Sequence, residues 1–383
     1  MTLIMQRVKI ERRGFNMTNE HSFHACTIIA KNYVAFARTL CDSFLAHHPN
    51  GVFHTLIVDD IDGYIDPAKE NFEIISLASL GIPNLRDFCF KYSITELSTA
   101  VKPYLLKYLI DEESINKILY LDPDILITNP LSMLFDELND HDIILTPHLD
   151  RDFPDDGFKP SDSNIMVSGT FNLGFIGVRK SDNVDRFLLW WQIKLYDKCI
   201  TDFAAGYFVD QKFIDYALVL FKDFSIIYDT GYNVAYWNLH SRQISYRDGD
   251  WQCNDGKLYF YHFSNYKPER PKIISAHLTR YSFADMPDLS RLFHLYQERL
   301  INNGYHESRT WPYTYNYFSS MKEFALIIKR TIRGYIVYVN IASLFNITNY
   351  PLYFKKILQL FSTIFKGVAS WIAGRFDRPK PRG

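Results

Sequence analysis

Residues 117–131 read KILYLDPDILITNPL, an apolar run that is interrupted by two aspartates with a proline between them. The segment ILYL is typical of a strand that is buried on both faces of a sheet. Further strands are predicted at residues 24–30, 52–60 and 71–77, with helical patterns at 34–48 and 100–111. This alternation predicts the α/β class, with a mostly parallel, Rossmann-like central sheet flanked by helices.

The two aspartates fall where ligands bind in sheets of this class, at the carboxyl end of a strand. Asp122 and Asp124 are two residues apart, so both would project to one side of an extended chain, and Pro123 stiffens the exit. Carboxylates so close repel each other unless a positive charge lies between them. A hard divalent cation would fill that place and would in turn bind a diphosphate. The alternative is that one aspartate caps the following turn and the other is solvated.

The composition indicates a globular protein and argues against some classes of site. The chain has 383 residues, of which 47% are hydrophobic and 16% aromatic, enough for a substantial core. Its five cysteines are scattered and form no C-x-x-C pair, which argues against a disulfide framework and a thiolate zinc site. The first residues contain no apolar segment of the kind found in secretory signals. We therefore expect a cytoplasmic protein.

Charge is distributed unevenly along the chain. The formal net charge is −1, but residues 321–383 carry a surplus of nine positive charges. Apolar blocks lie between these basic residues, and none is an uninterrupted run of about 20 residues, the length that a spanning helix needs. The pattern predicts a C-terminal appendage of basic amphipathic helices that binds an anionic membrane surface, on the inner face of the membrane. The alternative is a helical subdomain packed on the rest of the protein.

Four segments together carry a resemblance to a known family. They are ILYLDPDILI at 118–127, FNLGFIGVRKS at 171–181, FVDQKFID at 208–215 and YHFSNYKP at 261–268. In order and spacing they resemble nucleotide-sugar glycosyltransferases of the GT-A fold. They are most similar to family 8, which includes glycogenin and bacterial lipopolysaccharide galactosyltransferases. The similarity covers roughly residues 23–280.

The resemblance implies a division of the chain into domains. Residues 1–22 would be an N-terminal extension and residues 23–310 a GT-A domain. Within that domain, residues 23–130 would form the nucleotide-binding half and residues 131–310 the half that binds sugar and acceptor. Residues 321–383 would be the basic amphipathic tail.

The resemblance also implies a metal site. In the family, an Asp-x-Asp pair and a C-terminal histidine bind manganese, which maps here to Asp122, Asp124 and His262 with Mn²⁺ or Mg²⁺ as cofactor. Lys267 would lie near the donor diphosphate, although the interval from His262 to Lys267 is one residue shorter than usual and lacks the family's glycine. The residues themselves favour His262, because it follows the strand-like KLYFY and precedes a turn-rich exit. A hydrogen-bonded core histidine is the alternative.

Catalytic residues follow from the same comparison. Asp210 and Gln211 match the family's Asp-Gln pair near the anomeric carbon of the donor sugar. An aspartate there would hold sugar hydroxyls or stabilise an oxocarbenium-like transition state. A helix-terminal aspartate followed by a solvated glutamine is the alternative.

Donor contacts are implied at four further positions. Asn172 would lie near the sugar or the acceptor, with a turn-closing amide as the alternative, and Lys102 would reach the diphosphate. At the N-terminal strand the resemblance implies contacts from Thr27 and Asn32. The family's Ala-Asp-type contact to uracil and ribose is absent, because this chain reads IIAKNY with Lys31 and Asn32.

The function expected from these features is metal-dependent transfer of a sugar from a nucleoside diphosphate to a hydroxyl. The acceptor would be a glycan or lipid-linked glycan in the synthesis of a cell-surface polysaccharide or lipopolysaccharide, with retention at the anomeric carbon. No nucleic-acid partner is expected. Two alternatives stay open: an aspartate-nucleophile phosphatase built on Asp122 and Asp124, and a non-catalytic sugar-binding or scaffold protein at the membrane.

Overall fold

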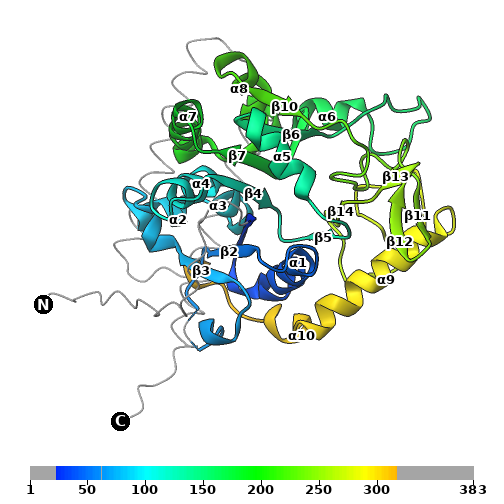
Figure 1. Cartoon of the computed structure of the whole chain (residues 1–383), viewed down its shortest axis with the longest axis horizontal. Helices are drawn as coiled ribbons and strands as arrows, with labels where there is room; N and C mark the ends of the chain where they lie inside the picture. The colour runs from blue at the N-terminus through cyan, green and yellow to red at the C-terminus, as the bar shows by residue number, and fades with distance from the viewer. Residues whose placement is uncertain (1–22, 62, 317–383) are drawn as a thin grey trace, which may run out of the picture.

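The computed structural model describes residues 23–61 and 63–316, and its centre is a seven-stranded sheet (Figure 1). The strand order is β10-β6-β7-β4-β1-β2-β3. The strands are β1 (His24–Ile29), β2 (Val52–Ile57), β3 (Glu73–Ser76), β4 (Lys117–Leu121), β6 (Ile143–Pro147), β7 (Phe171–Arg179) and β10 (Phe224–Ile226). All neighbours pair in parallel except β7, which runs antiparallel to β4 and β6. The predicted α/β class with a mostly parallel sheet is confirmed.

Helices cover both faces of this sheet. One face packs against α1 (Val34–His47) and α5 (Ser132–Asp140). The other face packs against a larger set of helices: α2 (Leu85–Lys91), α3 (Ile94–Ala100), α4 (Lys102–Asp111), α7 (Asp182–Lys198) and α8 (Ile214–Leu220).

The position of strand β4 between two cores explains why its sequence is apolar without interruption. Ile118 and Tyr120 point into the layer of α4 and α7, whereas Leu119 and Leu121 point toward α1 and α5. Successive side chains of a strand alternate between faces, and here both faces are buried. The apolar run therefore reflects two cores, one on each side of the sheet.

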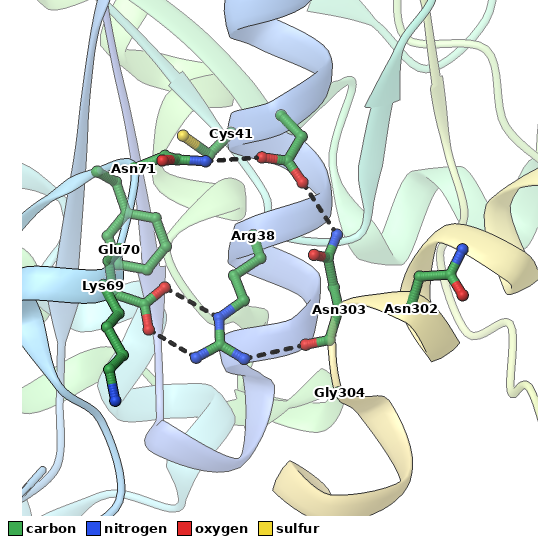
Figure 2. Close-up of a pocket in the computed structure, with 10 residues that line it drawn as sticks. Arg38, Cys41, Lys69, Glu70, Asn71, Asn302, Asn303 and Gly304 are labelled. Atoms are coloured by element: carbon green, nitrogen blue, oxygen red, sulfur yellow. Dashed lines mark hydrogen bonds and ion pairs between the residues drawn. The ribbon is translucent and has the colours of Figure 1, made fainter.

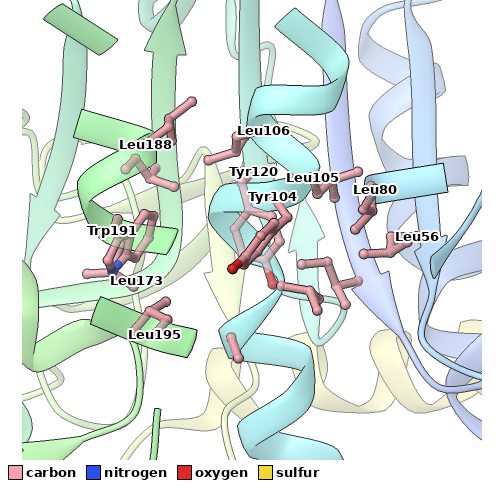
Figure 3. Close-up of a cluster of buried hydrophobic side chains, with 14 of the residues drawn as sticks. Leu56, Leu80, Tyr104, Leu105, Leu106, Tyr120, Leu173, Leu188, Trp191 and Leu195 are labelled. Carbon is pink, nitrogen blue, oxygen red and sulfur yellow. The ribbon is translucent and has the colours of Figure 1, made fainter. Parts of the chain in front are cut away.

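The core on the α4 side brings together the two halves of the chain that sequence comparison suggested. Figure 3 shows Leu105 and Leu106 beside Tyr120, with Leu188 and Trp191 of α7 in the same layer. The inward face of α7 is made of fully buried side chains: Val184, Phe187, Leu188, Trp191 and Leu195. Because strands from residues 23–130 and from 131–310 share one sheet, the two halves form one continuous body.

A second, smaller layer lies beyond α1. The short strand β5 (Ile125–Ile127) pairs antiparallel with β14 (Phe260–His262), so that His262 lies opposite Ile125. Helix α9 (Pro287–Asn302) packs against Tyr261 and Phe263 of this region. The remaining strands form the three-stranded sheet of β11 (Ile244–Arg247), β12 (Asp250–Cys253) and β13 (Gly256–Lys257) and the pair of β8 (Thr201–Asp202) and β9 (Tyr207–Phe208). The remaining α-helices are α6 (Asp162–Ser168) and α10 (Tyr305–Ser308).

One local expectation is wrong. Asp122 and Asp124 do not lie on an extended chain, because the segment between β4 and β5 is a turn in which Ile125 N donates to the carbonyl of Asp122 at 3.2 Å. Proline fits such a turn because its ring fixes φ and its missing N–H leaves no donor unsatisfied. The carboxylates are brought to one side by the turn rather than by strand periodicity.

Two predicted segments lie outside the described residues, namely the extension at 1–22 and the basic tail at 321–383. The proposed membrane binding of that tail stays a prediction. In residues 23–61 and 63–316, no helix combines the length and the apolarity needed to cross a membrane.

The buried face of α7 yields a first testable prediction. Trp191→Ala should lower the free energy of unfolding by about 3–5 kcal/mol, because it removes a large, fully buried ring and leaves a cavity. Ile193→Ala, on the same helix but 74% exposed, should change it by less than about 0.5 kcal/mol. Urea denaturation followed by circular dichroism measures both. Equal losses in the two variants would contradict the assignment of the α7 faces.

Candidate functional site

Three predicted residues meet at the carboxyl end of β4. The ligand atoms of Asp122, Asp124 and His262 all lie within 4.8 Å of one another. His262 Nε2 is 3.0 Å from Asp124 Oδ1 and 3.8 Å from Asp122 Oδ2. Both carboxylates are partly exposed and His262 is buried.

Backbone hydrogen bonds hold these three residues in place. Asp122 N donates to the carbonyl of Gly174 on β7 at 2.7 Å, and Phe263 N donates to the carbonyl of Asp124 at 2.8 Å. His262 N donates to the carbonyl of Val234 at 2.7 Å. Each residue is therefore positioned by a different neighbouring segment.

The donor set suits a divalent cation. Two carboxylate oxygens and one imidazole nitrogen are ligands that Mn²⁺ accepts and Mg²⁺ tolerates, and such ions bind ligands at a little over 2 Å. Ligand atoms that share an ion lie on the order of 3–4.5 Å apart, close to the spacing found here. Asp122, Asp124 and His262 thus fit a cation without a rearrangement of the backbone.

The surroundings of His262 tune its charge. Burial lowers the pKa of its imidazole, but the nearby carboxylates of Asp124 and Asp122 outweigh this effect, and the pKa is raised overall. The ring of Trp237 lies edge-on to the ring of His262, with centroids 5.2 Å apart. The indole Nε1 of Trp237 is buried and has no hydrogen-bond partner in the described part of the chain. The two carboxylates therefore dominate the electrostatic surroundings of His262.

A buried ion pair lies next to this cluster. Lys102 Nζ donates to Asp210 Oδ2 at 2.5 Å and to the carbonyl of Leu173 at 2.6 Å. The ammonium also lies 4.3 Å from the ring centre of Tyr120, whose hydroxyl donates to Asp122 Oδ1 at 2.6 Å. Burial raises the pKa of the Asp210 carboxyl, and the adjacent Lys102 ammonium opposes that rise without cancelling it. Tyr120 thus links the ion pair to the acidic cluster.

Gln211 and Asn172 belong to one buried amide network. Gln211 Oε1 accepts from Leu173 N at 3.0 Å, and Gln211 Nε2 donates to the carbonyl of Ser168 at 2.8 Å. Asn172 Nδ2 donates to Gln211 Oε1 and to His148 Nε2, both at 3.4 Å. Burial lowers the pKa of His148 to about 4, so its ring is neutral and offers an acceptor nitrogen. In this state both ends of the Gln211 amide are used within the protein.

The other predicted donor residues lie in different surroundings. Thr27 is fully buried in β1, and its Oγ1 has no partner in the described residues; the same holds for Oδ1 of half-buried Asn32. Lys31 is buried, and its Nζ donates to Asp59 Oδ1 at 3.3 Å. Lys267 is exposed. Contacts of these residues with a donor stay predictions.

A separate pocket of about 330 Å³ lies elsewhere, between α1, the segment before β3 and the end of α9 (Figure 2). Arg38 spans it, donating to both carboxylate oxygens of Glu70 and to the carbonyl of Asn303. Asn303 also donates to Asp42 at 3.1 Å. These groups satisfy one another, so the pocket is a polar junction that ties α9 to α1, and none of the predicted site residues lines it.

Two residues of the site escaped the sequence analysis. In the sequence Tyr120 is only one member of an apolar strand, although its hydroxyl donates to Asp122, two residues further on. Asn233 lies in the segment TGYNVAYWN, whose asparagines and glycine signal a loop but nothing more specific. Its hydrogen bond with His262 depends on a contact between distant segments.

Comparison with known proteins finds relatives of low sequence identity. No family model matches the chain. It is 25% identical over 280 residues to the uncharacterized protein YfnF of Bacillus subtilis (strain 168), covering 72% of this chain and 90% of that protein. It is 22% identical over 250 residues to the uncharacterized protein YfnD of the same strain, covering 64% and 78%.

Solved structures similar to this one include glycosyltransferases. The galactosyltransferase LgtC, in complex with donor and acceptor sugar analogues, is 16% identical with a TM-score of 0.43, covering 72% of this chain and 95% of LgtC. The glycosyltransferase GlyE of Streptococcus pneumoniae TIGR4 is 15% identical with a TM-score of 0.43, covering 77% and 66%. Mouse xyloside xylosyltransferase 1 is 15% identical with a TM-score of 0.39, covering 64% and 98%. These likenesses assign no residue of this chain a role.

The buried pair of Lys102 and Asp210 predicts a pH-dependent stability. Lys102→Met should lower the free energy of unfolding by about 3–5 kcal/mol at pH 7, because it leaves the Asp210 carboxylate buried without a countercharge. Since the pKa of Asp210 is raised above its ordinary 3.8 in the folded state, the folded state takes up a proton as the pH falls toward 4, and the deficit should shrink. Urea denaturation at a series of pH values measures this.

Lys69→Met is the control for that series. Lys69 is 81% exposed and pairs with Asp66 on the surface, so its loss should cost at most about 1 kcal/mol, with little dependence on pH. A Lys102→Met deficit that stays constant from pH 7 to pH 4 would contradict the unpaired-charge explanation.

The close packing around Gly174 predicts that a larger residue there would disturb the site. A Cβ there would lie 2.7 Å from His262 Nδ1 and 2.7 Å from Asn172 Oδ1, so Gly174→Ala must displace one of them. We expect a loss of about 1–3 kcal/mol in the free energy of unfolding. Gly256→Ala is the control, since its nearest neighbour would be Cys253 O at 3.8 Å. Equal thermal denaturation midpoints for the two variants would show that β7 does not hold His262 as described.

Proposed function

We propose that this protein is a metal-dependent glycosyltransferase that moves a sugar from a nucleoside diphosphate to a hydroxyl group. The observation that carries the proposal is the convergence of Asp122, Asp124 and His262 at the carboxyl end of β4. These are the three residues that the resemblance to family 8 implies as metal ligands. The position is also the one where ligands bind in open α/β sheets.

The acidic pair and His262 would hold Mn²⁺ or Mg²⁺. When bound, such a cation neutralises the negative charge that develops on the departing diphosphate. Tyr120 keeps one oxygen of Asp122 engaged through its 2.6 Å hydrogen bond and so restricts the rotation of that carboxylate. A fixed carboxylate needs less reorganisation during the reaction, which is how preorganised charges accelerate it.

Asp210 is our choice for the carboxylate that stabilises positive charge on the sugar. Its side chain is held by Lys102, and Tyr120 connects that pair to Asp122. A carboxylate in a buried setting interacts strongly with a developing oxocarbenium ion, because little water screens it. Gln211 and Asn172 lie in the adjoining amide network and would orient the sugar or acceptor.

The finer assignments rest on the resemblance. We propose retention at the anomeric carbon and a glycan or lipid-linked glycan as acceptor, as in the synthesis of a cell-surface polysaccharide or lipopolysaccharide. Trp237 offers a buried N–H without a partner in the described residues, which a bound acceptor would satisfy. The basic segment 321–383 would bring the protein to an anionic membrane surface that carries such acceptors.

The phosphatase alternative is less well supported. Its nucleophilic aspartate usually follows the first strand of the chain, whereas Asp122 and Asp124 follow β4. His262, 3.0 Å from Asp124, completes a ligand set that such a phosphatase has no need of. A non-catalytic sugar-binding protein would not require the buried Lys102–Asp210 pair beside the cluster.

The test is metal-dependent release of nucleoside diphosphate from a panel of nucleotide sugars. With Mn²⁺ present, the wild type should release nucleoside diphosphate from at least one donor, and excess chelator should abolish release. Asp122→Asn and Asp124→Asn should each slow release on the order of 100-fold or more, because each replaces a charged carboxylate ligand by a neutral amide of similar volume.

The exposed Asp255→Asn is the matched control and should match the wild type. Release from no donor in the panel, full activity in chelator, or comparable turnover by Asp122→Asn would overturn the proposed function. Release of phosphate from a sugar phosphate in place of donor cleavage would favour the phosphatase.

A further inference from the structure

A chain of hydrogen bonds runs from the backbone of β7 to the inner nitrogen of His262. It begins at Gly174, whose N–H donates to Asn172 Oδ1 at 3.0 Å. A backbone N–H can only donate, so the Asn172 side-chain atom that faces it must be the oxygen. The orientation of the Asn172 amide is therefore set by the main chain.

The next link is Asn233, which is fully buried. Its Nδ2 lies 3.1 Å from Asn172 Oδ1 and 2.8 Å from Thr146 Oγ1. Because Asn172 presents an oxygen, Asn233 must present its NH₂ group to it. The amide oxygen of Asn233 is then left to face the imidazole.

That oxygen lies 3.3 Å from His262 Nδ1. An amide oxygen only accepts, so His262 Nδ1 must carry a hydrogen. The neutral ring then has its lone pair on Nε2, the nitrogen that lies 3.0 Å from Asp124 Oδ1. Burial of Asn233 and His262 leaves no room for solvent to stabilise the opposite tautomer.

We propose that Asn233 is a positioning residue that holds His262 with Nδ1 protonated and Nε2 directed at the cation. This inference rests on the proposed metal site and extends it beyond the three ligands. In a ligating histidine, a hydrogen bond from the ring nitrogen that does not bind the metal fixes the tautomer and the orientation of the ring. Loss of that hydrogen bond typically weakens metal binding by about 10- to 100-fold. Asn233 thereby couples the geometry of β7 to the affinity for the cation.

The backbone conformation at Asn233 is one that glycine can adopt. Its φ is +50°, in the left-handed region that glycine adopts more readily than any other residue. Asn233→Gly therefore removes the amide without adding backbone strain. Asn84→Gly is the matched control, because Asn84 has φ +49°, is exposed and makes no side-chain capping hydrogen bond.

The first experiment is Mn²⁺ titration of the full chain, followed by electron paramagnetic resonance of the free ion. Asn233→Gly should bind Mn²⁺ about 10- to 100-fold more weakly than the wild type, and Asn84→Gly should bind it equally well. Wild-type affinity in Asn233→Gly would overturn the role of Asn233. Absence of Mn²⁺ binding by the wild type would instead overturn the proposed metal site.

The second experiment needs no variant at Asn233 and so does not depend on its folding. Wild-type protein with ¹⁵N-labelled histidine, loaded with one equivalent of diamagnetic Zn²⁺, gives ring nitrogen signals by NMR, and the His262→Asn variant identifies those of His262. We expect a protonated Nδ1 and a metal-bound Nε2. A protonated Nε2 with the metal at Nδ1 would refute the proposed orientation.

Discussion

The antiparallel pairing of β5 with β14 is the contact on which the candidate site depends. It places His262 opposite Ile125, immediately after the turn that carries Asp122 and Asp124. The same region ties Asp124 to Phe263 through a backbone hydrogen bond. A shift of this pairing by one residue would move the His262 side chain to the other face of β14, since side chains alternate along a strand. Register, more than any single side chain, therefore determines whether the three ligands meet.

Around this pairing, apolar and polar side chains occupy different parts of the protein. The faces of the central sheet are filled by aliphatic and aromatic side chains from helices on both sides. Buried polar groups are also found near the carboxyl end of β4 and beside β7, among them Lys102, Asp210, Asn172 and Asn233. Buried polar groups are costly unless they are paired, and each of these four has partners. The result is a hydrogen-bonded polar site next to two apolar cores.

The electrostatics of the site follow from the same arrangement. The acidic pair is flanked on one side by His262 and is linked on the other side, through Tyr120, to the Lys102–Asp210 pair. Because the interior screens charge weakly, these groups influence one another over several ångströms. Such coupling explains why the pKa of His262 is raised in spite of its burial. The same concentration of negative charge would attract a cation to the site.

The sequence by itself determined the α/β class, the buried strand β4 and the placement of Asp122 and Asp124 at its end, because these depend on local periodicity and on chain order. The inward face of α7 was predictable for the same reason. The sequence also pointed to His262, through the family resemblance and through the strand-like KLYFY that precedes it. Only the tertiary structure decided that Asp122-Pro123-Asp124 forms a turn and that Lys102 is engaged by Asp210. The role of Asn233 was equally out of reach, since its contacts with His262, Asn172 and Thr146 join segments far apart in the chain. Contacts of this kind depend on strand register and on the packing of side chains between elements, and neither leaves a periodic pattern in the sequence.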